Sequence, residues 1–207
     1  MELYETSVWI TAIVMMAGSF YYCFEIKKGT VSPPPATFII AAVTFTLSLF
    51  MYSRKPNWSF TANIGLTSAF LSAWIVCIYL TTKLLRERNF FLSINNWQKF
   101  ALTSALVVFI VWIITNNAFA SYLLLQIAAL IAYTPVIQKL WNAKKNSESL
   151  IFWTSLMLSS LVASYAAYER NDIEAWIYIF RDMNEFFNTR NAKSNIFRSN
   201  TTAVKCV

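Results

Sequence analysis

The sequence predicts an all-α membrane protein with seven transmembrane helices. Of its 207 residues, 57% are hydrophobic, 17% aromatic and only 13% charged, and the mean hydropathy is +0.47. A soluble domain carries about 25% charged residues. The apolar residues form blocks about twenty residues long, which is the length at which a helix crosses a hydrocarbon layer of about 30 Å. We therefore expect the chain to cross a membrane several times.

The first three predicted helices cover residues 7–26, 36–52 and 59–82. The three prolines at 33–35 separate the first two helices, because proline ends one helix and is accepted in the first turn of the next. The segment "SRKPNW" separates the second helix from the third. The acidic start "MELYET" lacks the basic region of a cleaved signal peptide, so we expect the first helix to be retained.

The remaining predicted helices cover residues 97–115, 117–141, 149–168 and 172–188. Asn116 and Asn117 form the short join between the fourth and fifth helices. The seventh helix is the most polar of the set. We nevertheless count it as a membrane-spanning helix, because a chain with six spans would place the basic carboxyl terminus outside the cell.

The chain also carries a weak internal repeat with an offset of 112 residues. The offset places Tyr21 on Tyr133 and Ser48 on Ser160, and each half reads long helix, basic linker, helix, outer loop, helix. Because the offset spans four helices, it predicts two parallel three-helix bundles joined by an inverting linker helix. The division is a first repeat at 1–83, a linker helix at 84–116, a second repeat at 117–189 and a polar, basic cytoplasmic tail at 190–207, which we expect to be disordered.

The basic residues predict the orientation in the membrane. If seven helices alternate in direction, thirteen Lys and Arg residues fall on one side and three on the other. The thirteen are Lys27, Lys28, Lys83, Arg86, Arg88, Lys99, Lys139, Lys144, Lys145, Arg190, Lys193, Arg198 and Lys205, and the three are Arg54, Lys55 and Arg170. Basic residues accumulate on the cytoplasmic side, so we predict the amino terminus outside and the carboxyl terminus in the cytoplasm. This placement accounts for the net charge of +7, and we expect no nucleic-acid partner.

Several functional classes lack the residues that they need. The absence of histidine excludes His-based zinc sites, His-assisted nucleophiles and a histidine proton relay. There is no Gly-rich phosphate loop, since the chain has only three glycines. Cys23, Cys77 and Cys206 fall on the predicted inner side, where we expect reduced thiols. We therefore predict no metal ion, no cofactor and no enzymatic activity, with a membrane-embedded enzyme kept as a remote third alternative.

The segment "YTPVIQKLWNAKKNSESLIFW", residues 133–153, places a proline inside a predicted helix. Pro135 removes one backbone hydrogen bond and bends the helix, and neighbouring helices in a membrane re-satisfy the freed carbonyl. Together with the basic residue Lys144 and the serine-rich run 147–149, it resembles the motif that ends the first helix of each repeat in SWEET sugar transporters and the wider PQ-loop family. The chain shares the family's 3+1+3 helix order. It departs from the motif at Val136, where the family has glutamine, and at Cys23, where the first repeat would have proline.

The resemblance implies a sugar-like solute and a proline bend that closes an inner gate. Pro135, Tyr133 and its repeat partner Tyr21 are therefore the candidates for a gate or hinge. The resemblance also implies an asparagine in the solute site on the third and seventh helices. Asn63 fits the first of these positions, and Asn184 or Arg181 fits the second.

Polar residues within the apolar spans support a central cavity, since each costs a few kcal/mol unless it faces partners or water. Helical spacing places polar residues in a stripe along each of three predicted helices. The stripe on the seventh helix is Glu174, Tyr178, Arg181, Glu185 and Asn188. The stripe on the third is Ser59, Asn63 and Thr67, and that on the fifth is Tyr122, Gln126, Ala129 and Tyr133. The third and seventh helices are equivalent in the repeat, so their stripes are expected to face each other. The candidate substrate-binding residues are Asn63, Thr67, Gln126, Trp153, Tyr178, Arg181 and Asn184, and the candidates for proton coupling are Asp182 and Glu185.

Each of these residues also has a purely structural explanation. Arg181 and Glu185 are four residues apart and suit an intrahelical ion pair or extension to the interface. Asn63 suits a helix cap, and Gln126 suits a hydrogen bond between helices. Trp153 suits either stacking on a flat ligand or contact with lipid.

The predicted function is transport of a small polar solute, sugar-like or another metabolite, by alternating access without ATP. The predicted partners are this solute and the lipid bilayer, and whether the chain forms a homo-oligomer stays open. The alternative is a membrane receptor or sorting protein of the same fold, which binds its ligand without moving it.

Overall fold

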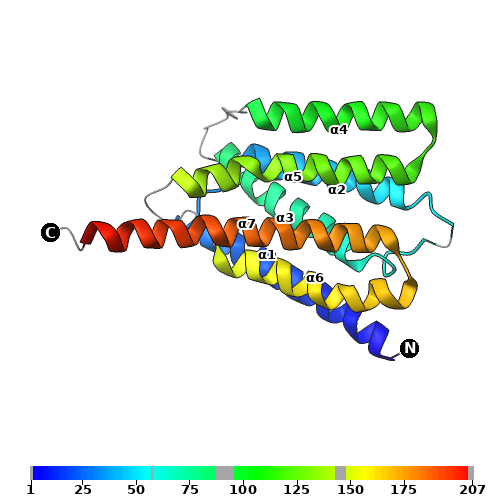
Figure 1. Cartoon of the computed structure of the whole chain (residues 1–207), viewed down its shortest axis with the longest axis horizontal. Helices are drawn as coiled ribbons and strands as arrows, with labels where there is room; N and C mark the ends of the chain where they lie inside the picture. The colour runs from blue at the N-terminus through cyan, green and yellow to red at the C-terminus, as the bar shows by residue number, and fades with distance from the viewer. Residues whose placement is uncertain (1, 57, 87–95, 143–147, 205–207) are drawn as a thin grey trace.

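The computed structural model describes residues 2–56, 58–86, 96–142 and 148–204, with side chains except at Glu2, Pro135, Asn142 and 193–204. The described residues form seven helices: α1 (Glu2–Lys28), α2 (Pro35–Tyr52), α3 (Ile64–Arg86), α4 (Asn96–Thr115), α5 (Ala118–Asn142), α6 (Leu150–Arg170) and α7 (Ile173–Val204). The helices run alternately in opposite directions, and the two termini lie at opposite ends of the bundle (Figure 1). Among the described residues, six helices, α1 to α6, are long and apolar enough to cross a membrane. The all-α fold is confirmed, and these helices are those of a multi-pass membrane protein.

The two ends of the bundle are named here by the terminus that lies at each. The N-terminal face carries the α2–α3, α4–α5 and α6–α7 connections, and the C-terminal face carries the α1–α2 connection and the extended end of α7 (Figure 1). The basic residues in the last turns of α1, α3 and α5 lie at the C-terminal face. They favour these positions because cations stabilise the negative end of a helix dipole.

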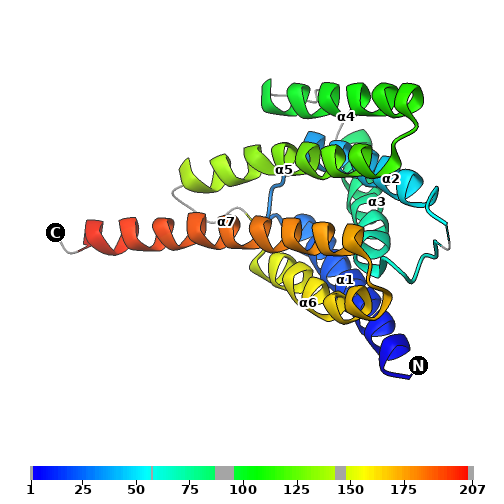
Figure 2. The same cartoon turned by 45° about the vertical axis from the view of Figure 1, so that its right-hand side comes forward.

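Helix α7 differs from the other six in composition, since it carries Arg181, Asp182 and Glu185 within its first four turns. These three side chains are buried, because α7 packs against α5 and α6 and also contacts α3 (Figure 2). Residues 190–207 are predicted to be disordered. This prediction is wrong up to Val204, because the backbone continues as helix α7 to that residue. Thr189 and Ala192 are still buried in the bundle, and the end of α7 extends beyond it (Figure 1).

Local sequence explains where several helices begin and end. Gly29 follows α1 with φ of 75°, a left-handed conformation in which glycine has no Cβ penalty. Pro35 opens α2, where its missing N–H and fixed φ are tolerated. Ser149 caps α6 by accepting a hydrogen bond from the Phe152 N–H at 3.1 Å, and Asn171 ends this helix with φ of 47°.

The start of the third helix differs from the prediction. α3 begins at Ile64 and not at residue 59, and it continues to Arg86, beyond the predicted end of the first repeat at residue 83. Ser59 Oγ accepts a hydrogen bond from the Ala62 N–H at 3.0 Å, which holds this segment as a turn. Side-chain bonds of this kind compete with the helix for backbone groups.

The packing leaves α4 on the outside of the bundle. α1 contacts α3 and α6, α2 contacts α3 and α5, and α7 contacts α5 and α6, whereas α4 contacts α5 and α2 (Figures 1 and 2). Four residues of α4 are buried, namely Gln98, Ala101, Ala105 and Val108, and most of its other apolar side chains face outward. Such a surface suits hydrocarbon, so lipid is the expected neighbour of α4.

Gly18 allows α1 and α6 to approach each other closely. A Cβ added at this position would lie 1.8 Å from Ser155 Oγ and 2.6 Å from Ser155 Cβ. Rotation of the Ser155 hydroxyl relieves the first clash but not the second. We therefore predict that Gly18→Ala destabilises the protein by about 1–3 kcal/mol through overpacking, and that Ser155→Gly in the same chain restores most of the loss.

Thermal unfolding of the detergent-solubilised protein measures this effect. Ala17→Val is the matched control, because Ala17 is exposed on the same helix. If Gly18→Ala and Ala17→Val change the melting temperature equally, α1 and α6 are not in the close contact described here.

Candidate functional site

A small closed cavity lies in the centre of the bundle. Its lining comes from every helix except α4 and comprises Met15, Phe38, Phe45, Ala69, Ser72, Ala73, Tyr133, Phe152, Leu156 and Tyr178. Its volume is about 10 Å³, which is room for about one water molecule. No lining residue is more than 4% exposed. The wall is aromatic and apolar apart from the hydroxyl-bearing side chains Ser72, Tyr133 and Tyr178.

A chain of buried hydrogen bonds runs beside this cavity and joins four helices. On α5, Gln126 donates from Nε2 to Ser48 Oγ of α2 at 3.1 Å and accepts at Oε1 from Arg181 Nη1 at 2.5 Å. Arg181 Nη2 donates to Asp182 Oδ1 at 2.5 Å, and Ser160 Oγ of α6 donates to Asp182 Oδ2 at 2.9 Å. The chain begins at Ser48 and ends at Ser160, the two serines that the 112-residue offset places on each other.

The Arg181 guanidinium is 4% exposed and lies against two rings of the cavity wall. Its Cζ is 4.7 Å from the Phe45 ring centroid and 4.5 Å from the Tyr178 ring centroid. Cation–π contacts of this kind are strongest where water is excluded. The same guanidinium therefore connects the hydrogen-bond chain to the cavity.

Glu185 adds a second carboxylate to the cluster. Its side chain is 2% exposed, and Oε1 lies 3.3 Å from Arg181 Nε. Among the described residues, this oxygen has no hydrogen-bond partner. The cluster thus contains one cation and two carboxylates, so one negative charge is uncompensated if all three groups are ionised. An intrahelical ion pair of Arg181 and Glu185 exists, as one structural explanation predicted, but the bond to Asp182 is shorter.

Ion pairs close the bundle at the N-terminal face. Lys55 follows α2, and its Nζ lies 3.0 Å from Asp172 Oδ1 and 2.5 Å from Glu174 Oε2. Tyr52 donates from its hydroxyl to Asp172 Oδ2 at 2.5 Å. Tyr122 of α5 donates to the carbonyl of Glu174 at 2.9 Å. The α6–α7 turn is thereby fixed to the end of α2.

The charges of this closure persist over a wide pH range. Burial acts to raise the pKa of Asp172, but hydrogen bonds with Tyr52, Glu174 and Lys55 outweigh it and lower the pKa below its ordinary value. Burial acts to lower the pKa of Lys55, but the bonds to Glu174 and Asp172 raise it above its ordinary value. A lowered acid pKa preserves the pair to a pH below the ordinary range of an aspartate, and a raised lysine pKa preserves it to a pH above the ordinary range of a lysine.

Different contacts close the C-terminal face. Tyr22 of α1 donates from its hydroxyl to Glu148 Oε2, just before α6, at 2.7 Å. The Tyr22 ring stacks on Phe152 with centroids 4.4 Å apart. Lys139 of α5 donates to the carbonyl of Ser32 and, at 3.1 Å, to the Ser32 hydroxyl in the α1–α2 connection. The cavity is therefore closed toward both faces of the bundle.

The structure brings seven of the predicted residues together. Gln126, Tyr178, Arg181, Asp182 and Glu185 belong to the cluster or to the cavity wall, Tyr133 lines the cavity, and Trp153 packs edge-on against Tyr133 at 5.8 Å. Contact of Trp153 with lipid, one of its two explanations, is wrong, because Trp153 is only 1% exposed.

Four of the predicted residues lie away from this centre. Asn63 is the cap of α3 and accepts at Oδ1 from the Leu66 N–H at 3.2 Å. Thr67 donates to backbone carbonyls, including that of Phe60 at 2.8 Å. Asn184 is exposed and accepts from Asn188 Nδ2 at 3.2 Å, and Tyr21 is 38% exposed. The polar stripe predicted on the third helix is therefore not formed.

The predicted motif is described only in part. Pro135 lies within α5, but its side chain and residues 143–147 lie outside the described part of the chain.

Sequence reasoning missed four residues that make important contacts. Tyr22 gave no signal, because an aromatic residue in an apolar helix looks like core. Glu148 stands in the serine-rich run, Lys55 stands in a predicted connection and Asp172 is the first residue of the predicted seventh helix, and charged residues are ordinary at such positions. Only the three-dimensional arrangement pairs Lys55 with Asp172, 117 residues later in the chain.

No family model matches the chain, and neither a curated protein nor a solved structure matches it. Within the described ranges, no group of three or more Cys, Asp or Glu side chains is placed to hold a metal ion. The arguments about function therefore rest on the cavity, the charged cluster and the two closures.

The buried ion pair gives a direct prediction. Arg181→Gln leaves Asp182 and Glu185 without their cation, and we expect it to destabilise the protein by about 3–5 kcal/mol. Adding Asp182→Asn is expected to recover part of this loss, because it removes one unpaired carboxylate. Thermal unfolding in detergent measures both variants. Arg190→Gln, on the exposed surface of the same helix, is the control; an equal effect of the two arginine variants would contradict a structural role for the pair.

Proposed function

We propose that the protein is a membrane transporter that moves a small polar solute by alternating access without ATP. The observation that carries the proposal is the central cavity, which is closed toward both faces and bordered by a charged cluster. Charged residues within membrane helices are costly and concentrate along substrate and ion pathways. With room for about one water molecule, the closed cavity corresponds to an occluded state without solute, and it has to widen as either face opens in turn.

The contacts between helices support the proposed 3+1+3 architecture. The proposed repeat pairs α1 with α5, α2 with α6 and α3 with α7. Under this pairing, the α1–α3, α2–α3 and α1–α6 contacts correspond to the α5–α7, α6–α7 and α2–α5 contacts. All six contacts are present. This is the pattern expected of two parallel three-helix units related by a pseudo-two-fold axis. α4 lies outside the pattern, as a linker helix would.

The two closures join one proposed unit to the other. At the N-terminal face, Lys55 belongs to the first unit and Asp172 to the second. At the C-terminal face, Tyr22 belongs to the first and Glu148 to the second. Rocking of the two units about the cavity would separate one pair while the other stays formed, which is the movement that alternating access requires.

The walls favour a solute with a flat apolar side and hydroxyl or amide groups. Phe38, Phe45 and Phe152 supply aromatic surface, and Tyr133 and Tyr178 supply hydroxyls. Asp182 and Glu185 are the groups available for proton coupling. These features fit the sugar-like solute that the SWEET and PQ-loop resemblance implies. By the same proposal, the N-terminal face is outside the cell and the C-terminal face is cytoplasmic.

A solute screen followed by flux measurement tests the proposal. Thermal stabilisation of the purified protein by sugars, polyols, nucleosides and amino acids identifies ligands, and uptake into proteoliposomes shows whether they move. We expect Tyr133→Phe to weaken binding of a hydroxyl-bearing solute about fivefold, because one hydrogen bond is lost. Tyr21→Phe is the matched control, since Tyr21 is its partner in the repeat but lies outside the cavity.

Binding without flux would contradict transport and would favour the receptor alternative. If Tyr21→Phe weakens binding as much as Tyr133→Phe does, the solute site is not the central cavity.

Opening at the N-terminal face has its own prediction. In a chain with Cys23, Cys77 and Cys206 replaced, Ala69→Cys places a thiol in the cavity wall. We expect Lys55→Met to increase the rate at which a water-soluble thiol reagent reaches this cysteine, because the ion pairs that close the face are lost. The ratio of the labelling rates with and without Lys55→Met should be the same at pH 5 and pH 8, because the pKa shifts keep Asp172 and Lys55 ionised at both.

Arg54→Met is the control, because Arg54 lies over the Phe50 ring and not in the ion pairs. Equal labelling of the Lys55 and Arg54 variants would show that these pairs do not close the cavity.

A further inference from the structure

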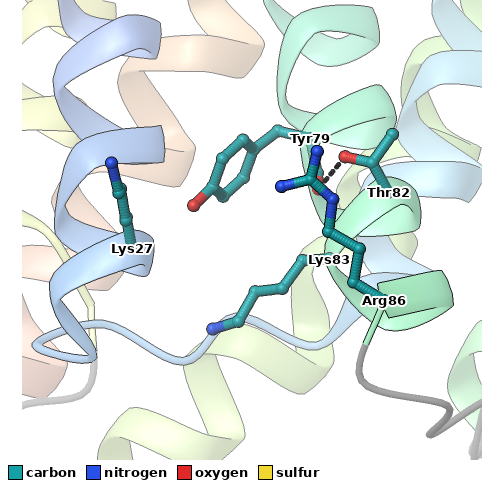
Figure 3. Close-up of a pocket in the computed structure, with 5 residues that line it drawn as sticks. All are labelled: Lys27, Tyr79, Thr82, Lys83 and Arg86. Carbon is teal, nitrogen blue, oxygen red and sulfur yellow. Dashed lines mark hydrogen bonds between the residues drawn. The ribbon is translucent and has the colours of Figure 1, made fainter.

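A second pocket lies at the C-terminal face, between the ends of α1 and α3, and it does not belong to the central cavity. Its volume is about 370 Å³, and it is lined by Lys27, Tyr79, Thr82, Lys83 and Arg86. Lys27 comes from α1 and the other four from the last two turns of α3. Figure 3 shows Tyr79 and Lys83 extending from α3 toward α1, with Lys27 on the opposite side of the gap.

The shape of this pocket follows from the way that α1 and α3 pack. The Ser19 and Ser72 hydroxyls are 2.6 Å apart and hold the two helices together in the bundle interior. Near the face, Lys83 Nζ donates to the carbonyl of Ile26 at 3.3 Å, and this contact bridges the two helix ends. Thr82 donates to the carbonyl of Tyr79 at 2.8 Å, which places its side chain on the pocket wall. The pocket thus lies between two helices that are held together in the interior and bridged near the face.

The charge of the lining is unbalanced. Among the described residues, three cations line the pocket and no carboxylate does. Glu25 is close in sequence, but it lies two residues before Lys27 and therefore points to another side of α1. Like charges gathered in one pocket repel each other, so an anion bound among them would lower the free energy of the site.

Helix dipoles and the membrane-side bias explain basic residues at helix ends in general. They do not explain why three of them converge from two helices on one pocket that also presents two hydroxyl-bearing side chains. Other basic residues in the described chain have contacts of a different kind. Lys28 lies over the Phe24 ring, Arg170 lies over the Tyr4 ring, and Lys139 donates to Ser32.

We propose that this pocket binds a phosphate-bearing anion. A phosphate carries up to two negative charges and several acceptor oxygens, which match ammonium, guanidinium and hydroxyl donors. A volume of this size is within the range of small-molecule sites and accommodates a phosphate with an attached polyol. Basic pockets between transmembrane helices bind the headgroups of anionic lipids. The exposed side chains Phe24 and Ile78, on the same two helices, lie where acyl chains would run.

Binding to the full-length detergent-solubilised protein tests the proposal, with native mass spectrometry as the readout. The probes are dioctanoyl phosphatidylinositol 4-phosphate and, as the neutral comparison, dioctanoyl phosphatidylcholine. We expect the anionic lipid to bind at least about tenfold more tightly. The variant Lys27→Gln/Arg86→Gln is expected to bind the anionic lipid about 25-fold more weakly, at about fivefold for each cation. It retains Lys83 and hence the bridge between the helix ends.

The matched control is Lys28→Gln/Lys99→Gln, which removes the same charge near the same face but changes no residue of the pocket. We expect it to bind the anionic lipid within about twofold of the unmodified protein. Tyr79→Phe, which keeps every charge, is expected to weaken binding through loss of one hydroxyl. Equal loss in the two double variants, or equal binding of the two lipids, would overturn the proposal.

Two further probes distinguish a lipid from a soluble anion. Inositol phosphate and inorganic phosphate are titrated as competitors of the anionic lipid. Competition at a concentration close to the lipid's own dissociation constant assigns the site to a soluble phosphorylated compound. Lipid binding at least tenfold tighter than either competitor assigns it to a lipid headgroup. None of these measurements depends on solute transport, so their outcome is independent of the proposed function.

Discussion

The buried ion pair between Arg181 and Asp182 determines where α7 is placed. An ionised guanidinium within a membrane requires partners on all sides, because the cost of an uncompensated buried charge is several kcal/mol. Those partners come from Gln126 on α5, from the Phe45 ring on α2 and, through Asp182, from Ser160 on α6. α7 is therefore packed against α5 and α6, and the apolar α4 is left on the outside of the bundle.

The two closures of the cavity differ in their physical chemistry. At the N-terminal face the contacts are ionic and Lys55 is partly exposed, so water and salt weaken them. At the C-terminal face Tyr22 is fully buried, its hydroxyl bonds to Glu148 and its ring stacks on Phe152. Opening this face would break aromatic packing as well as a hydrogen bond. The N-terminal face is thus expected to respond to ionic strength, and the C-terminal face to changes in packing.

Periodicity predicted much of the fold and part of the site. The apolar blocks identified the first six helices, the distribution of basic residues supported the seventh, and the spacing of Tyr122, Gln126 and Tyr133 correctly marked the buried side of α5. The same reasoning failed on α3, because Ser59 and Asn63 bond to the backbone before the helix begins. Short polar side chains satisfy either a turn or a binding site, and sequence spacing does not distinguish the two. Contacts between distant segments, such as Tyr22 with Glu148, leave no periodic signal.

The two polar regions of the molecule select opposite charges. Beside the central cavity, one guanidinium faces two carboxylates, and Glu185 Oε1 has no hydrogen-bond partner among the described residues. If all three groups are ionised, an anion brought into that cavity would add to one uncompensated negative charge, at a place where low dielectric strengthens repulsion. The pocket between α1 and α3 has, among the described residues, three cations in its lining and no carboxylate. Under the two proposals, phosphorylated solutes are disfavoured at the centre and phosphate groups bind at the C-terminal face, so that the proposed solute and the proposed anion do not compete for one site.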